Sequence, residues 1–176
     1  MSWPQPGGRV LRSALRSGST KRHYGSLEGL SHAAAERLYG AEQVRRWRRT
    51  WDAVPPRLPP GDARDPSRDP RYAALPSGEL PPGGLPDGES LADALARQLP
   101  LLTVELGPLV GAGATVLLVG HGNSLRALVA HLERMPAGRV PGLLVPTGVP
   151  LVYEMAGDFW RARPVKFGLT GSQTGP

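Results

Sequence analysis

The chain has 176 residues, enough for one domain, and carries a formal net charge of +6. The absence of cysteine excludes disulfides and thiolate metal sites, and it allows a reducing compartment. No apolar run approaches the roughly 20 residues of a membrane span, and the N-terminus lacks the apolar core of a signal peptide. The basic side chains are almost all arginine, as GC-rich coding produces, and no nucleic-acid-binding motif accompanies them. We therefore expect a cytoplasmic protein without a membrane or nucleic-acid partner.

The N-terminal segment is polar, rich in glycine, serine and arginine, and lacks sustained periodicity. This composition is typical of disorder, so residues 1–21 are predicted to be unstructured. One domain is predicted over residues 22–170, followed by a short tail over residues 171–176. The chain contains no internal repeat.

Two helical stretches open the domain, "SHAAAERLYG" and "AEQVRRWRRTWD". Ser31 is the predicted N-cap of the first helix, and Gly40 separates the two. Proline and glycine then crowd residues 55–88, where no regular element is expected. A loop of this length inside a domain indicates a functional or mobile segment.

The stretch "ESLADALARQLPLLTVELGPLVGAG" predicts a helix with a leucine stripe, bent or split at Pro100. The apolar run over residues 116–119 predicts a strand buried on both faces of a parallel sheet. Apolar residues then recur at i, i+3, i+4 and i+7, which predicts an amphipathic helix. Asn123 or Ser124 can cap that helix.

Two further strands are predicted at the end of the chain, "GVPLVYEM" and "RARPVKF", with Gly157 and Asp158 in the turn between them. Strand patterns thus follow helix patterns along the second half of the chain. This order predicts an α/β fold.

His121 lies where the predicted buried strand gives way to a helix N-terminus. In open α/β sheets this junction is the crevice where ligands bind, and free N–H groups there favour an anion. Gly120 and Gly122 flank the histidine and allow backbone to approach a ligand closely. The alternative is a histidine that only hydrogen-bonds a loop, and the short Gly-His-Gly string needs partners elsewhere in the chain.

Candidate partners are basic residues in the first half of the chain. Arg22, His23 and Tyr24 come before a glycine, and four arginines follow on one predicted helix, at positions 45, 46, 48 and 49. Arginine matches phosphate or carboxylate with two parallel hydrogen bonds, so this cluster is a candidate phosphate site. An ordinary solvated helix face with two packing tryptophans is an equally good interpretation of the helix alone.

Several stretches resemble, in the same order, the bisphosphoglycerate-dependent phosphoglycerate mutase family of the histidine phosphatase superfamily. They are "RHYGSLEGL", "YGAEQVRRWRRTWDAVPP", "DPRYAALP", "ESLADALARQLP", "VLLVGHGNSLRALVAHLE" and "VPTGVPLVYE". The resemblance implies a three-layer α/β/α fold and a glycolytic and gluconeogenic isomerase. Such an enzyme interconverts 3-phosphoglycerate and 2-phosphoglycerate through a phosphohistidine, with 2,3-bisphosphoglycerate as cofactor and no metal.

The matching motifs also imply roles for individual residues. His121 is similar to the second active-site histidine of the family, which contacts the phosphoryl group. The implied substrate-binding residues are Arg22, Tyr24, Arg48, Arg49, Gly122 and Asn123. Cationic groups and N–H donors that converge on a transferred anion fit this chemistry.

The sequence departs from the family at the catalytic positions. The family begins with a strand that ends in Arg-His-Gly-Glu and carries the phosphorylated histidine, and this motif does not occur here. A general-acid glutamate of the family is replaced by Lys21, and a family lysine is replaced by His32. One extra nucleotide before Arg22, which shifts the reading frame, would explain both the missing motif and the lysine. A wrong start and genuine degeneration are the alternatives for the missing N-terminal part. We therefore expect an incomplete phosphoglycerate mutase-like fold.

Three functions follow from these observations. The first is the mutase that the family resemblance implies. The second is a catalytically inactive remnant that binds phosphoanions, which is favoured physically because covalent transfer needs the missing nucleophile. The third is a basic nucleic-acid binder, the least supported of the three. An incomplete sheet leaves strand edges and apolar faces exposed, so we expect marginal stability or self-association into homo-oligomers.

Overall fold

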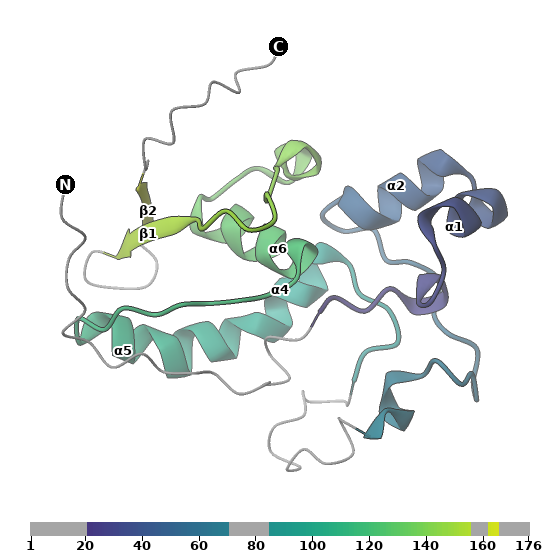
Figure 1. Ribbon diagram of the computed structural model, residues 1–176, viewed down its shortest axis with the longest axis horizontal. Helices are drawn as coiled ribbons and strands as arrows, with labels where there is room; N and C mark the ends of the chain where they lie inside the picture. The colour runs from purple at the N-terminus through teal and green to yellow at the C-terminus, as the bar shows by residue number, and fades with distance from the viewer. Residues whose placement is uncertain (1–20, 71–84, 156–161, 166–176) are drawn as a thin grey trace.

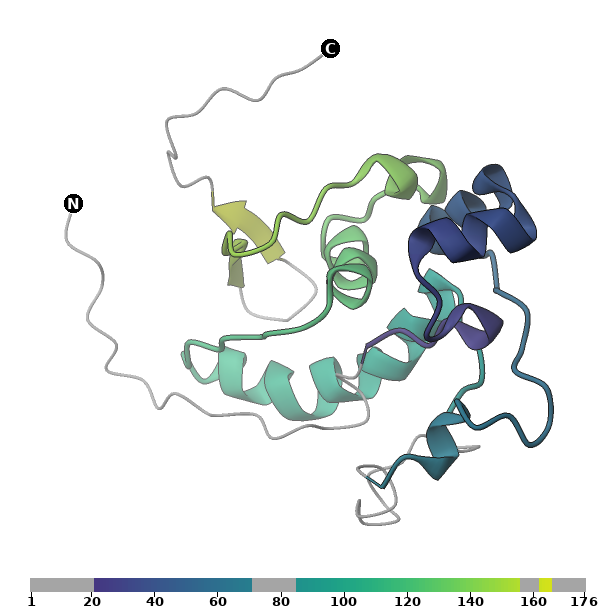
Figure 2. The ribbon, with the colours of Figure 1, turned by 45° about the vertical axis from the view of Figure 1, so that its right-hand side comes forward.

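A computed structural model describes residues 21–70, 85–155 and 162–165 (Figure 1). The predicted unstructured segment, apart from Lys21, lies outside the described residues, as do the predicted tail and the turn at Gly157 and Asp158. Helices α1 and α2 lie at one end of the molecule, strands β1 and β2 lie toward the other, and α4 and α6 lie between them (Figures 1 and 2).

Helices α1 (His32–Tyr39) and α2 (Ala41–Arg49) form as the sequence predicts. Ser31 caps α1, because its hydroxyl oxygen accepts a hydrogen bond from the backbone N–H of Ala34 at 3.2 Å. Gly40 ends α1 with a φ of +83°, a left-handed conformation that favours glycine. The two helices bury a small core against the preceding segment, made of Leu27, Ala35 and Val44.

At Gly25 the backbone comes into close contact with the long loop over residues 55–88. Gly25 lies in the 3-10 turn η2 (Gly25–Leu27) with a φ of +56°, and a Cβ there would lie 2.1 Å from the carbonyl oxygen of Pro56. Only glycine fits this position. The described part of residues 55–88 is mostly irregular, as predicted, but it contains the 3-10 turn η3 (Pro66–Arg68) and a helical residue at Pro70, which the sequence did not predict.

The predicted leucine-striped helix is continuous rather than split. It runs through α4 (Leu91–Pro100), the π-helical turn η5 (Leu101–Leu106) and α5 (Gly107–Gly111). Proline has no N–H to donate to the preceding turn, and the chain accommodates this by widening to π-helical geometry directly after Pro100. Leu91 and Leu95 of α4 are buried in the main core, together with Ala127 and Ala130 of α6.

Helix α6 (Gly122–Leu132) packs against α4, and the 3-10 segment η6 (Ala137–Gly142) follows it. The predicted caps of α6 are wrong by two or three positions. His121 is the N-cap residue, with extended backbone angles and no capping hydrogen bond from its side chain. Asn123 lies inside the first turn, where its side chain bonds Tyr24 instead of the helix backbone.

The predicted strand at residues 116–119 is wrong in this structure. The segment is extended but pairs with no strand among the described residues, and the exposed fractions of Leu117 and Val119 are 69% and 78%. A buried strand needs neighbours on both sides, and the described residues supply none.

The two strands predicted at the end of the chain are confirmed. Strands β1 (Val152–Met155) and β2 (Ala162–Val165) pair antiparallel, with Val152 opposite Val165 and Met155 opposite Ala162. They are the whole sheet of the described residues. The fold is therefore an incomplete α/β phosphoglycerate mutase-like fold, rich in helix and poor in strand. No helix in the described ranges has both the length and the apolar character to cross a membrane.

Candidate functional site

An open cleft of about 810 Å³ lies where α1 and α2 meet η6. Its lining is dominated by arginine, and the charged or titratable residues on it are His32, Glu36, Glu42, Arg45, Arg46, Arg48 and Arg49. Four guanidinium groups face two carboxylates, so the cleft carries excess positive charge. Such a lining favours an anion.

Arg48 stands out among these arginines. Its guanidinium lies over the ring of Tyr24, with the central carbon 5.0 Å from the ring centroid. Within the described part of the chain, the Nε atom of Arg48 is buried and has no hydrogen-bond partner. A buried donor without a partner is uncommon, and this Nε–H is free to donate a hydrogen bond to a ligand.

Tyr24 connects the arginine cleft to the N-terminus of α6. Asn123 donates a hydrogen bond from Nδ2 to the hydroxyl oxygen of Tyr24 at 2.5 Å. Arg126 in turn donates from Nη1 to Oδ1 of Asn123. Three residues that the resemblance implies as substrate-binding, Tyr24, Arg48 and Asn123, are thus brought together.

His121 and Gly122 are both exposed at the start of α6. His121 lies two positions before Asn123, and Gly122 lies directly before it. No atom outside its chain neighbours and its own helix backbone lies within 4 Å of the position a Cβ would take at Gly122. At Gly120 that position lies 3.3 Å from Leu125, so this glycine instead allows close packing of the helix. The predicted close approach of a ligand to the backbone therefore has room at Gly122 but not at Gly120.

Arg22 does not lie in the cleft. The side chain is fully buried, and it donates hydrogen bonds to four carbonyl oxygens, those of Trp47, Arg48, Ala53 and Glu89, at 2.6 to 3.3 Å. Burial lowers the pKa of the guanidinium to about 10. The structure therefore gives Arg22 a crosslinking position outside the cleft, and the substrate contact that the resemblance implies stays a prediction.

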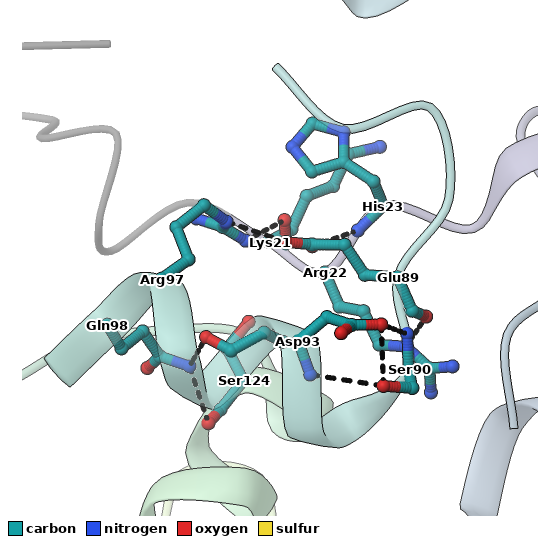
Figure 3. A network of polar contacts seen from close by, with 10 residues as sticks. Lys21, Arg22, His23, Glu89, Ser90, Asp93, Arg97, Gln98 and Ser124 are labelled. Carbon is teal, nitrogen blue, oxygen red and sulfur yellow. Dashed lines mark hydrogen bonds and ion pairs between the residues drawn. The ribbon is translucent and has the colours of Figure 1, made fainter. Parts of the chain in front are cut away.

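A second polar network lies beside Arg22 (Figure 3). Arg97 of α4 forms a buried ion pair with Glu89, with its Nε 2.7 Å from Oε1 and its Nη2 2.9 Å from Oε2. Oε2 of Glu89 also accepts a hydrogen bond from the backbone N–H of His23 at 3.0 Å. The network joins the segment around His23 to the N-terminal end of α4, where Ser90 and Asp93 form a capping box.

Lys21 is the residue that the resemblance aligns with a general-acid glutamate. Its Nζ forms an ion pair with Oε2 of Glu28 at 3.0 Å, and the lysine is exposed. Oε1 of the same glutamate accepts a hydrogen bond from the backbone N–H of Tyr24. Lys21 is thus held by a surface carboxylate.

Residues 60–166, over half of the chain, match the family model of the histidine phosphatase superfamily (branch 1). The chain belongs to the histidine phosphatase superfamily. The solved structures it is similar to include mycobacterial glucosyl-3-phosphoglycerate phosphatase with VO3, at 26% identity and a TM-score of 0.46, covering 76% of this chain and 52% of that one. The same phosphatase with inorganic phosphate has 27% identity, a TM-score of 0.42, and coverage of 72% and 49%. Mycobacterial hydrolase 1 has 26% identity, a TM-score of 0.43, and the same coverage.

The chain spans about half the length of these solved proteins. The described residues contain no group of three or more histidine, cysteine, aspartate or glutamate side chains that could hold a metal ion.

Arg126, which lies near the cleft, was not predicted from the sequence. Its exposed fraction is 6%, and it lies on the apolar face of α6. One signal was available, because Arg126 follows Asn123 by three positions, and side chains with that spacing meet on a helix. Glu89 and Arg97, eight positions apart, gave no comparable signal, because their pairing depends on how the chain enters α4.

Stability is expected to decrease as the pH falls below neutral, because burial lowers the pKa of His23 from its ordinary value of 6.5. Arg97 and Lys21 lower it further, and Glu89 and Glu28 oppose the shift. The unfolded chain then binds a proton at a higher pH than the folded chain, so stability present above 6.5 is lost as the pH falls through 6.5 toward the folded pKa.

Urea unfolding at about pH 7.5 and about pH 5.5 tests this expectation. His23→Gln keeps the backbone N–H that bonds Glu89 and should reduce the pH dependence. His32→Gln, at an exposed position, is the matched control and should leave it unchanged. Equal pH dependence in the unaltered chain and His23→Gln would contradict the assignment.

Proposed function

We propose that this chain binds a small phosphorylated carboxylic acid of the phosphoglycerate class in the arginine cleft. The observation that carries the proposal is the lining, where four guanidiniums converge and the buried Nε of Arg48 lacks a partner among the described residues. Guanidinium groups bind phosphate and carboxylate with paired, charge-assisted hydrogen bonds, so a ligand with both groups suits several arginines at once.

The finer form of the proposal is a phosphoglycerate mutase-like site that takes 2-phosphoglycerate, 3-phosphoglycerate or 2,3-bisphosphoglycerate. Arg48 and Arg49 would hold the anionic groups, and Tyr24 with Asn123 would contact them from the side of α6. His121, exposed at the N-terminus of α6, would meet a phosphoryl group at that end.

We propose binding without turnover. Of the histidines, His23 is buried in the fold and His131 is half-buried, which leaves His32 and His121 as exposed imidazoles. Where the family places its general acid, Lys21 is paired with Glu28 and cannot protonate a leaving oxygen as a carboxyl does. The residues that the resemblance implies for binding are thus present, whereas no residue of this sequence matches the general acid or the nucleophilic histidine of the family.

Titration calorimetry with 3-phosphoglycerate and with 2,3-bisphosphoglycerate tests the binding. The Arg48→Ala/Arg49→Ala double variant should weaken binding by about tenfold to hundredfold, because each guanidinium contributes charge-assisted hydrogen bonds. Arg57→Ala is the matched control, since this exposed arginine only reaches Asp87 at 3.8 Å. Absence of heat with the folded chain, or unchanged affinity in the double variant, would overturn the proposal.

Turnover is measured on the same protein. We expect no conversion of 3-phosphoglycerate, no release of inorganic phosphate, and no phosphohistidine after incubation with 2,3-bisphosphoglycerate. Conversion or release that is abolished by His121→Ala would replace the binding proposal with an enzymatic one.

A further inference from the structure

Arg126 is a buried cation beside the cleft that neither the resemblance nor the proposed function accounts for. Its exposed fraction is 6%, and it projects from the middle of α6. Nε donates a hydrogen bond to the carbonyl oxygen of Leu143 at 3.0 Å, and Nη1 donates to Oδ1 of Asn123. Two fixed contacts on different segments hold the guanidinium in one orientation.

This contact decides how the amide of Asn123 is oriented. A guanidinium has donors only, so the amide must present its oxygen to Arg126 and its Nδ2 group to Tyr24. The hydroxyl oxygen of Tyr24 therefore accepts a hydrogen bond, at 2.5 Å. With that contact occupied by an incoming N–H, the hydroxyl proton of Tyr24 points away from Asn123 and can be donated to another acceptor.

Tyr24, which carries this hydroxyl, contacts one arginine of the cleft through its ring. The central carbon of the Arg48 guanidinium lies 5.0 Å from the ring centroid. Arg49 is close enough to Arg126 for its charge to lower the pKa of that guanidinium, after the larger effect of burial. Burying a second cation near Arg49 costs free energy. In return, the buried guanidinium maintains the chain of hydrogen bonds from Leu143 through Asn123 to Tyr24.

We propose that Arg126 is a positioning residue of the arginine cleft, which orients Asn123 and, through it, directs the hydroxyl proton of Tyr24 to an anion held by Arg48. The inference rests on the proposed binding of a phosphorylated acid. It assigns Tyr24 the role of donor to that anion, and it gives the direction of every hydrogen bond in the chain that leads to it.

Asn123→Asp is the sharpest test, because it keeps the size of the side chain and its contact with Arg126 but removes the Nδ2 donor. Tyr24 would then donate its hydrogen bond to the new carboxylate, and the bound anion would lose the hydrogen bond from Tyr24. Affinity for 3-phosphoglycerate should fall by about tenfold, the value of one hydrogen bond to a charged group. Tyr24→Phe should cause a similar loss, and the two changes together should cost little more than either alone.

Arg126→Met should weaken binding similarly, also without adding to the effect of Tyr24→Phe, and Arg126→Lys should restore part of the affinity. Arg57→Met removes one positive charge at an exposed position and is the control for net charge. Thermal melts confirm that each variant is folded, and Asn123→Asp decides the question if Arg126→Met does not fold.

Unchanged affinity in Asn123→Asp, or losses that multiply to about a hundredfold when combined with Tyr24→Phe, would overturn the inference. If the unaltered chain binds 3-phosphoglycerate while these variants behave in that way, only the role of Arg126 fails. If the unaltered chain does not bind it at all, the proposed function fails as well.

Discussion

Arg22→Met is expected to lower the free energy of unfolding by about 3–5 kcal/mol. Arg22 donates to four carbonyl oxygens, and two of them, those of Trp47 and Arg48, belong to the last turn of α2. Carbonyls in that turn have no helical partner, and a buried cation there also complements the helix dipole. Methionine fills a similar volume but leaves these buried acceptors unpaired. Urea denaturation followed by far-UV circular dichroism measures the loss.

Lys21→Met is the matched control at the neighbouring position. Lys21 is exposed and makes a surface ion pair with Glu28, so its removal should cost less than about 1 kcal/mol. If Arg22→Met instead kept full stability and abolished binding of 3-phosphoglycerate, Arg22 would be a ligand-binding residue, as the resemblance implies. The pair of variants therefore separates the crosslinking role from the binding role.

The helices were predictable from the sequence because their signals are local. The cap at Ser31, the break at Gly40 and the leucine stripe of α4 each depend on residues within one or two turns. The sheet was only partly predictable. Strands β1 and β2 pair with each other across a short connection, whereas residues 116–119 need partners from distant segments, and Leu117 and Val119 remain exposed without them.

The candidate site was likewise only partly predictable from the sequence. Helical spacing predicts that Arg45 shares a helix face with Arg48 and with Arg49, and all three residues line the cleft. The roles of Arg22 and Arg126 depend on which carbonyls and amides come within reach after folding, and the spacing of Arg126 from Asn123 is the one local sign of them in the sequence. Both arginines are buried, against the usual preference of arginine for the surface, so their burial could only be found in the structure.

Glu89→Gln is expected to destabilise the fold by about 3–5 kcal/mol, although it changes only one charge. Glu89 is 2% exposed and receives two hydrogen bonds from Arg97 and one from the backbone of His23. An amide can accept on its oxygen, but its NH2 group would face a guanidinium donor, and the buried cation would lose its counter-charge. Thermal and urea denaturation of the single variant measure this cost.

Arg97→Met in the Glu89→Gln background should recover most of the lost stability, to within about 1–2 kcal/mol of the unaltered chain. The second change removes the uncompensated cation, and the glutamine oxygen remains to accept from the N–H of His23. Asp87→Asn breaks the exposed pair with Arg57 and serves as the surface control, with an expected cost below about 1 kcal/mol. A double variant less stable than Glu89→Gln would mean that Arg97 stabilises the fold through its other contacts, and that the ion pair is not the reason for its burial.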